Sequence, residues 1–244
     1  MKKAVVLLSG GLDSAVTLYI AKEKGFKPLC LIFDYGQRHR REIESAKKIA
    51  QEAGCTFKVL KIDLIHKRSA LLDKKIKIPQ LANSRTHELK NDIPMTYVPA
   101  RNIIFLSFAL SFAETLGESA VFIGAHAQDY SGYPDCRPEF FRAFARMAKA
   151  GTKSGVEGKE IKIFVPLLNK KKSEIISEGL RLGVPFRLTW SCYRGGRRPC
   201  NKCDSCYYRA KGFRELGIKD PLLAGTVPAE SGAPNHPIGL GASP

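Results

Sequence analysis

The chain has 244 residues, which is enough for one α/β domain with a substantial core and a small appendage. It has no apolar run near the roughly 20 residues that cross a membrane, and its start, Met1-Lys2-Lys3, lacks the length and cleavage site of a signal peptide; we therefore expect a cytoplasmic protein that does not bind membranes. The net charge of +17, from 40 Lys and Arg against 23 Asp and Glu, favours anionic partners. Because no RNA-binding motif accompanies the basic clusters at 38–41, 74–75 and 170–172, direct binding of nucleic acid is not expected.

A strand, a glycine turn and a helix at the start of the chain predict an anion-binding site. Residues 4–8 are an apolar run typical of a buried parallel strand, and residues 15–22 predict the first turns of a helix. Between them lies Ser9-Gly10-Gly11-Leu12-Asp13-Ser14. The glycines let the backbone approach a phosphate, and the free N–H groups of the helix start attract an anion. Asp13 can cap the helix or help to hold magnesium. No Gly-Lys-Ser/Thr follows, which excludes the lysine-containing phosphate loop.

Strand-like and helix-like segments then alternate along the chain. Strands are expected at 28–34, 57–62, 120–124 and 161–165, and helices at 40–54, 102–116, 138–149 and 173–182. The polar residues 67–93 are expected to form a mobile loop over the site. The alternation predicts an α/β fold with a doubly wound, mostly parallel sheet and helices on both faces. In such folds the ligand binds at the carboxyl ends of the strands, where we expect Ser9, Asp34, His126 and Asp129.

Four of the seven cysteines lie close together near the end of the chain. They have the spacing C-x7-C-x2-C-x2-C, and their positions are Cys192, Cys200, Cys203 and Cys206. Four thiolates suit a closed, structural zinc site, and an iron–sulfur cluster would also accept them. We favour zinc because nothing in the sequence indicates redox chemistry. The metal would stabilise residues 189–204, which are poor in apolar groups, and would dock a following helix at 204–216 onto the sheet.

The motifs resemble those of known families. Residues 9–14 resemble the SGGxDS loop of the ATP pyrophosphatase superfamily, which binds the pyrophosphate half of ATP. Three further segments resemble the 7-cyano-7-deazaguanine synthase family of queuosine and archaeosine biosynthesis: YVPARN at 97–102, DYSGYPDCRPEF at 129–140, and the cysteine loop that TWSCY opens at 189–193. This resemblance runs from about residue 4 to about residue 221. His126 is a departure, because the family more often has asparagine there.

The family resemblance implies a fold, a reaction and its partners. An adenine nucleotide α-hydrolase-like domain would convert 7-carboxy-7-deazaguanine, ammonia and two ATP into the nitrile through two adenylation steps and an amide. It would use magnesium with the ATP and carry one structural zinc. The expected division is an ATP-pyrophosphatase domain at 1–188, a zinc-binding loop and helix at 189–221, and a disordered tail at 222–244. The sequence also allows a homodimer.

The motifs and the resemblance together suggest a role for each site residue. ATP binding is expected at Leu8, Ser9, Gly10, Gly11, Leu12, Asp13, Ser14, Ala15, Val16, Thr17, Leu18 and Asp34. The candidates for catalysis are Asp13, Arg101, His126 and Asp129. The candidates for binding the deazaguanine are Asp129, Ser131 and Asp135. The expected zinc ligands are Cys192, Cys200, Cys203 and Cys206.

Two other functions are compatible with parts of the sequence. An ATP-dependent enzyme that thiolates a tRNA base would share the SGGxDS loop, and the high positive charge favours it. Such an enzyme usually needs a catalytic cysteine or cluster beside the ATP site, and only Cys136 is a candidate there. A zinc-knuckle binding protein without enzymatic activity is the second alternative, but it leaves the phosphate loop unexplained.

Overall fold

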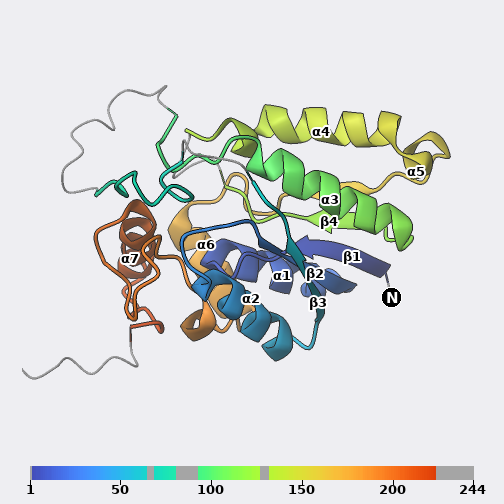
Figure 1. Cartoon of the computed structure of the whole chain (residues 1–244). Coiled ribbons are helices and arrows are strands. Elements are labelled where there is room, and N and C mark those ends of the chain that lie inside the picture. Colours follow the sequence, from blue (N-terminus) through green and yellow to red (C-terminus); the bar gives the residue numbers. More distant parts are fainter. Residues whose placement is uncertain (1, 65–68, 81–92, 127–131, 224–244) are drawn as a thin grey trace, which may run out of the picture.

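A parallel five-stranded sheet forms the centre of the molecule. The computed structural model describes residues 2–64, 69–80, 93–126 and 132–223. The strands are β1 (Lys2–Leu7), β2 (Phe26–Asp34), β3 (Thr56–Lys61), β4 (Ala120–Phe122) and β5 (Lys162–Phe164), in the order β3-β2-β1-β4-β5. Val5 pairs with Leu29 of β2 and with Val121 of β4, which places β1 in the middle. All the strands run towards the side of the molecule where α7 lies (Figure 1).

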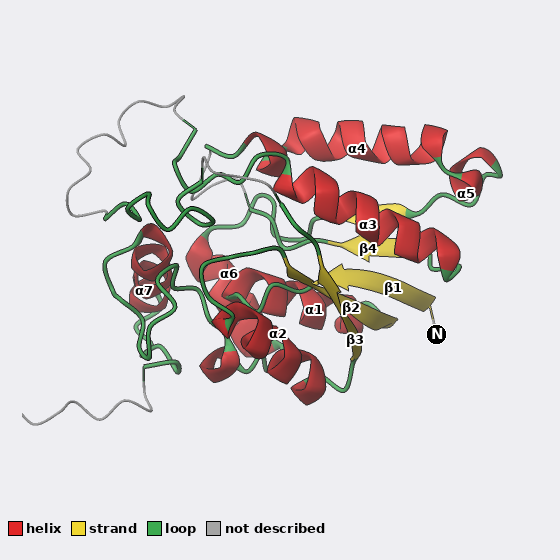
Figure 2. Ribbon diagram, in the orientation of Figure 1, coloured by secondary structure: helices red, strands yellow, loops and turns green. Residues whose placement is uncertain are grey.

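Helices cover both faces of this sheet (Figure 2). On one face lie α1 (Leu12–Glu23), α2 (Arg41–Glu52) and α6 (Lys172–Arg181), and on the other lie α3 (Arg101–Thr115) and α4 (Pro138–Gly151). The short α5 (Lys153–Val156) follows α4, and α7 (Asp204–Glu215) stands beyond the carboxyl ends of the strands. Two 3₁₀ turns, η3 (Pro134–Cys136) and η4 (Phe186–Leu188), complete the described elements. The doubly wound parallel sheet is therefore confirmed.

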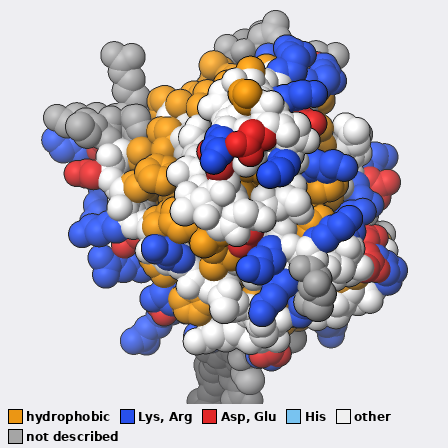
Figure 3. All heavy atoms as spheres, turned by 90° about the vertical axis from the view of Figure 1, so that its right-hand side faces the viewer, with side chains coloured by type: hydrophobic (Ala, Val, Ile, Leu, Met, Phe, Trp, Pro, Cys, Tyr) orange, Lys and Arg blue, Asp and Glu red, His pale blue; other side chains and the backbone are white. Residues whose placement is uncertain are grey.

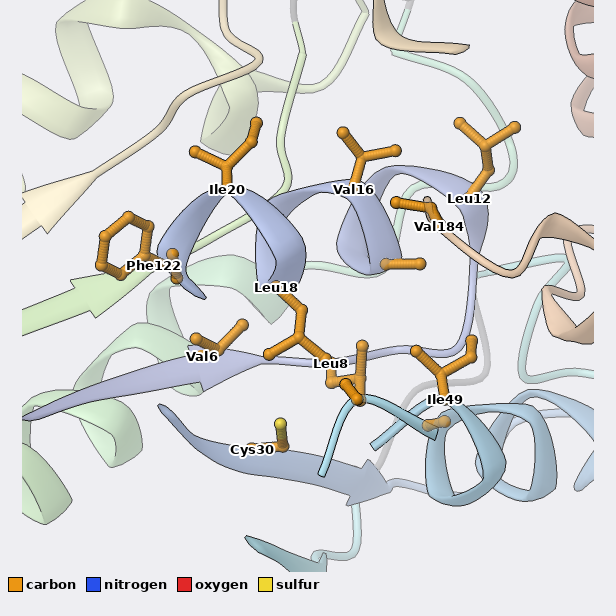
Figure 4. Packing of buried hydrophobic residues seen from close by; sticks show 14 of the residues in the cluster. Val6, Leu8, Leu12, Val16, Leu18, Ile20, Cys30, Ile49, Phe122 and Val184 are labelled. Carbon is orange, nitrogen blue, oxygen red and sulfur yellow. The ribbon is translucent and has the colours of Figure 1, made fainter. Parts of the chain in front are cut away.

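The alternation of side chains along the strands divides the core into two layers. Ala4, Val6 and Leu8 of the first strand region pack towards α1, α2 and α6, whereas Val5 and Leu7 pack towards α3 and α4. Figure 4 shows Leu18 of α1 pointing from the helix towards Val6 and Leu8. Because period-2 alternation sends neighbouring residues to opposite faces, an apolar run such as 4–8 serves both layers at once.

Each expected strand and helix is present, with ends that differ by a few residues. The helix α1 begins three residues early, at Leu12, since Leu12, Asp13 and Ser14 already belong to its first turn. The sequence did not predict α5 or the two 3₁₀ turns. Of the expected loop at 67–93, residues 69–80 form turns without a helix or strand, and residues 81–92 lie outside the described residues. Most of the expected tail, 224–244, lies outside them as well. No helix in the described ranges has the length and apolar character needed to cross a membrane.

The turn at Gly10 yields a testable prediction about stability. Gly10 has a φ of +85°, and a Cβ there would lie 2.1 Å from the carbonyl oxygen of Glu42. Gly25 has a similar φ of +79° but faces open space. Gly25→Ala should therefore lower the free energy of unfolding by only about 1 kcal/mol, because alanine is strained in the left-handed conformation. Gly10→Ala should lower it by about 3 kcal/mol or more, because α2 must also move. Urea unfolding of both variants measures this, and equal losses would contradict it.

Candidate active site

A cavity of about 300 Å³ opens at the carboxyl ends of the strands. Its walls come from the ends of β1 and β2, from the first turns of α1, α2, α3 and α7, and from the segments around residues 37–39, 123–126 and 191–193. One part is apolar and aromatic, with Leu7, Phe33 and Phe105. Another is polar and charged. A cavity with both characters at this edge of a doubly wound sheet suits a nucleotide together with a second ligand.

The serine–glycine loop enters the cavity at the N-terminus of α1. The hydroxyl of Ser14 donates to the carbonyl of Gly11 at 3.1 Å and lies 3.0 Å from the hydroxyl of Ser9. The backbone N–H groups of Ser9 and Gly11 donate to these hydroxyls, at 3.2 and 3.3 Å. The loop is thus held by its own serines, and the N-terminal N–H groups of α1 give this end of the cavity a positive potential.

Three charged or titratable side chains meet beside this loop. The ammonium of Lys172 lies 2.8 and 3.0 Å from the two carboxylate oxygens of Asp13, and 2.9 Å from Nε2 of His126. Nε2 of His126 is also 3.4 Å from Asp13 Oδ2. Burial alone would raise the pKa of Asp13, but Lys172 and His126 hold it well below its usual range. Asp13 is therefore a permanent anion, and the carboxylate is unsuited to act as a base.

Arg101 also lines the cavity, from the start of α3. Burial would lower its pKa, but Tyr35, Tyr133 and Asp135 raise it, so the guanidinium stays charged. The backbone N–H of Asn102 donates to Asp135 Oδ2 at 3.0 Å, and the Asn102 amide donates to the Asp135 carbonyl at 3.1 Å. The Asp135 carboxylate therefore holds the N-terminus of α3, where a negative charge is favoured. This contact fixes Arg101 at a place where its planar fork can meet a carboxylate or a phosphate.

Two further groups at the cavity titrate far from their ordinary values. Burial raises the pKa of Glu42 to about 7 in spite of the nearby Arg101, with the charge of Cys192 adding to the rise. Burial likewise raises the pKa of Cys136 to about 12, with Asp135 as the second cause. The Cys136 thiol, which accepts from the Asn102 amide at 3.3 Å, is therefore protonated at neutral pH. The Glu42 carboxyl can gain or lose a proton near neutral pH, as a group that transfers protons must.

The four clustered cysteines converge on one point. One Sγ atom from each lies within 4.8 Å of the others. A tetrahedral zinc with bonds of about 2.3 Å would need sulfur separations of about 3.8 Å, and Cys200 Sγ is 4.0 Å from Cys206 Sγ. The N–H groups of Cys200 and Cys203 point at sulfurs, at 3.3 and 3.4 Å. Such N–H donors favour thiolates over thiols, so this donor set fits a metal ion.

The cysteine loop also forms one wall of the cavity. The N–H of Trp190 donates to the carbonyl of Gly10 at 2.8 Å, which ties the loop to the serine–glycine turn. The guanidinium of Arg41 lies over the Trp190 ring, 4.2 Å from its centroid, and donates to the carbonyl of Gly196. Asp204 and Tyr208, on α7, which also carries Cys206, line the cavity. The loop that carries the cysteine cluster therefore also positions one wall of the cavity.

The structure brings several of the expected site residues together and leaves others apart. The cavity is lined by Leu8, Ser9, Leu12, Asp13, Ser14, Arg101 and His126. Residues 15–18 are buried in α1, so their side chains do not reach it. Asp34 does not line it and lies 3.9 Å from the exposed Arg40. Asp135 does not line it either. The expected residues Asp129 and Ser131 lie outside the described residues.

The sequence analysis missed many residues of the cavity, and three of them, Lys172, Glu42 and Tyr133, show why. Lys172 belongs to a basic cluster that is typical of a solvated helix face. Only its contact with Asp13, 159 positions away, marks it as a residue of the site. Glu42 lies at the start of a helix that follows a strand end, which is the signal that marks functional positions in this fold. Tyr133 belongs to the segment that identified the family, and its ring stacks 5.9 Å from that of Tyr97.

Comparison with known proteins gives consistent matches. The chain matches the family model described as queuosine biosynthesis protein QueC over residues 3–217. It is 51% identical over 223 residues to the 7-cyano-7-deazaguanine synthase of Trichodesmium erythraeum, covering 91% of this chain and 100% of the relative. It is 52% identical over 222 residues to that of Trichormus variabilis, covering 90% and 97%. Among solved structures, the NMN synthetase of Francisella tularensis aligns with a TM-score of 0.46 and 15% identity, covering 89% of this chain and 78% of that one.

The first prediction for this site concerns Lys172. Lys172→Met should leave the anionic Asp13 without its closest cation and remove a positive charge from the phosphate end of the cavity. ATP should then bind at least tenfold more weakly, because removing a cation that pairs with a ligand's phosphate across a binding interface costs about 2 kcal/mol or more. The matched control is Lys171→Met, at the exposed neighbouring position. Isothermal titration calorimetry with Mg-ATP measures both, and equal affinities would remove Lys172 from the site.

The second prediction concerns the cysteine cluster. Cys203→Ser should lose the bound metal, because three thiolates hold it much more weakly than four. Amide hydrogen exchange should then rise first in residues 189–216 and next at the Gly10 turn, which Trp190 contacts. Cys55→Ser, outside the cluster, is the control. Elemental analysis and exchange mass spectrometry give the result; retained metal would exclude Cys203 as a ligand.

Proposed function

Because this chain belongs to the QueC family of queuosine biosynthesis proteins, we propose that it makes 7-cyano-7-deazaguanine from 7-carboxy-7-deazaguanine and ammonia at the expense of ATP. The observation that carries the proposal is one cavity whose lining includes both residues of the serine–glycine loop and the charged Arg101. A reaction that joins ATP to a carboxylate needs a phosphate-binding group and a carboxylate-binding group in one space.

The proposed chemistry uses one site twice. A carboxylate oxygen of the substrate attacks the α-phosphorus of ATP, which releases pyrophosphate and leaves an acyl adenylate. Ammonia displaces AMP and loses a proton, which gives the amide. The amide oxygen then attacks a second ATP, again with release of pyrophosphate. Loss of AMP and of the remaining nitrogen protons leaves the nitrile. Both rounds break the same phosphorus–oxygen bond, so the same loop can serve in each.

In this proposal different residues of the cavity bind different parts of the reactants. The N–H and hydroxyl groups of the loop, with Lys172, bind the pyrophosphate half of ATP. Arg101 binds the substrate carboxylate. Asp13 would hold the magnesium ion, which neutralises phosphate charge when bound. Glu42, whose pKa is raised to about 7 mainly by burial, faces the cavity and suits the removal of a proton from nitrogen. Roles for His126, Asp129, Ser131 and Asp135 stay predictions, as does the contribution of Asp34 and of residues 15–18 to ATP binding.

The metal in the cysteine cluster is proposed to be one structural zinc ion. Four cysteine ligands leave no open position for water or substrate, so the ion would stabilise the cavity wall and take no part in the chemistry. An iron–sulfur cluster remains the alternative, and its visible absorption would distinguish it from colourless zinc. The proposal further includes the division of the chain at 1–188, 189–221 and 222–244 and a cytoplasmic location. It also includes a homodimer, which analytical ultracentrifugation can check.

The thiolation alternative gains no support at the cavity. It would need a sulfur nucleophile there. Among the described residues, Cys136 is the one cysteine that lines the cavity, and it lies outside the cluster. With a pKa raised to about 12, mainly by burial, its thiol is a poor nucleophile at neutral pH.

Mass spectrometry of the product tests the function. The purified protein with 7-carboxy-7-deazaguanine, ammonium, ATP and magnesium should yield the nitrile, together with AMP and pyrophosphate. Asp13→Ala and Ser14→Ala should each reduce turnover at least tenfold, because groups that stabilise a transferring phosphoryl group contribute about 3 kcal/mol. Ser177→Ala, on the exposed side of α6, should not. Consumption of tRNA in place of the free base would contradict the proposal, and full activity in both loop variants would remove the loop from the mechanism.

A further inference from the structure

A second cavity, of about 570 Å³, adjoins the first and is lined mainly by cations. Its charged residues are Arg38, Lys74, Lys77 and Arg194, and the others are Ile76, Ile78 and Gln80. No acidic side chain lines it within the described part of the chain. The nearby Asp73 uses its Oδ1 to accept the N–H of Lys75 at 2.8 Å. The cations come from three segments that are far apart in sequence, so the fold brings like charges together here, which is unfavourable unless an anion joins them.

Arg38 connects the two cavities, because it lines both of them. Its guanidinium donates to the carbonyls of Asp73 and Ile76, and its N–H donates to the carbonyl of Leu71 at 3.2 Å. Its buried Nε has no hydrogen-bond partner among the residues that the structure describes. On the same wall, the buried Ile78 packs with Trp190 and the cysteine cluster. The basic cavity therefore shares Arg38 with the first cavity and lies against the cysteine loop.

The opposite end of the molecule has a different charge pattern. Figure 3 shows the face at the amino ends of the strands, where Lys and Arg are interspersed with Asp and Glu. On α5 and just after it, Lys153 and Lys159 both lie 3.7 Å from the carboxylate of Glu157. These lysines have acidic neighbours and lie on another side of the fold. The basic cavity differs from this face in that no acidic side chain lines it within the described residues.

The proposed reaction gives such a cavity a use. Each product molecule requires two ATP, so two pyrophosphate ions must leave the loop, and the first must leave while the amide remains bound. Pyrophosphate and the triphosphate of ATP are the most highly charged species in the reaction. A passage lined by cations raises the local concentration of such anions and speeds their exchange.

We infer that the basic cavity is a second binding site for the polyphosphate anion, through which pyrophosphate leaves the serine–glycine loop and ATP enters. The inference rests on the proposed function. Its ligand is inorganic pyrophosphate, bound by Arg38, Lys74, Lys77 and Arg194 after it leaves the loop.

Direct binding to the full-length protein tests this inference. The loop is first filled with an ATP analogue that carries a methylene group between the α- and β-phosphorus, and pyrophosphate is then titrated by calorimetry. Wild type should bind it. The variant Lys74→Ala/Lys77→Ala should bind it about tenfold more weakly at low ionic strength, with a smaller difference as salt is added. Lys153→Ala/Lys159→Ala removes the same charge from the opposite face and should bind like wild type.

Three outcomes would overturn the inference: no pyrophosphate binding to the analogue-loaded wild type, unchanged affinity in the cavity variant, or an equal loss in the control variant. Loss of tRNA binding in the cavity variant, with pyrophosphate binding intact, would assign the cations to nucleic acid and also overturn it. Circular dichroism checks that both double variants fold. Because this measurement needs no turnover, it is independent of nitrile formation: a wild type that makes the nitrile but does not bind pyrophosphate here refutes only the second site.

Discussion

The backbone of Gly10 is the point at which three parts of the molecule meet. On one side α2 packs so closely that a Cβ would lie 2.1 Å from the Glu42 carbonyl oxygen. On the other side, the Gly10 carbonyl accepts the N–H of Trp190, at the entrance to the cysteine loop. The close packing of α2 and the φ of +85° both require a residue without a side chain here. The anion-binding turn, the wall that carries Glu42 and the metal-binding wall are therefore placed relative to one another through a single peptide unit.

Charge is distributed in the site in two different ways. Beside the loop, the carboxylate of Asp13 is balanced by the ammonium of Lys172, and His126 lies next to both, which makes a compact group that can exchange partners when phosphate and magnesium arrive. Around Arg38 the cations have no carboxylates lining the same cavity in the described ranges. Balanced charges keep a site ordered before its ligand binds, whereas unbalanced charges attract a ligand from a distance. A reaction that consumes two polyanions in succession can use both arrangements.

The cysteine loop forms a wall of the cavity, and a metal ion held by its four cysteines would stabilise that wall from outside the cavity. The loop has few apolar groups of its own. Trp190 and the cysteines, of which all but Cys200 are buried, pack with Ile78 and Leu222. The buried pair of Arg209 and Asp220, with N···O distances of 2.6 and 2.8 Å, anchors α7 to the following chain. With the ion in place, the first residues of α7 form a rigid wall for the cavity. Metal binding in such a loop is in effect part of the folding free energy of the site.

The sequence by itself determined the features that depend on neighbouring residues: the strands and helices, the anion-binding turn at 9–14, the four cysteines of one cluster and the family. The elements and the cysteine cluster follow from periodicity and spacing, which act within one element or one loop, and the family follows from the resemblance of the motifs. Only the tertiary structure decided which side chains meet. It brought Lys172 to Asp13, turned Asp135 from the cavity to the N-terminus of α3, buried residues 15–18 in the core, and joined Arg38 with Lys74 and Arg194. Each depends on how elements distant in sequence pack together, and local pattern carries no information about that packing.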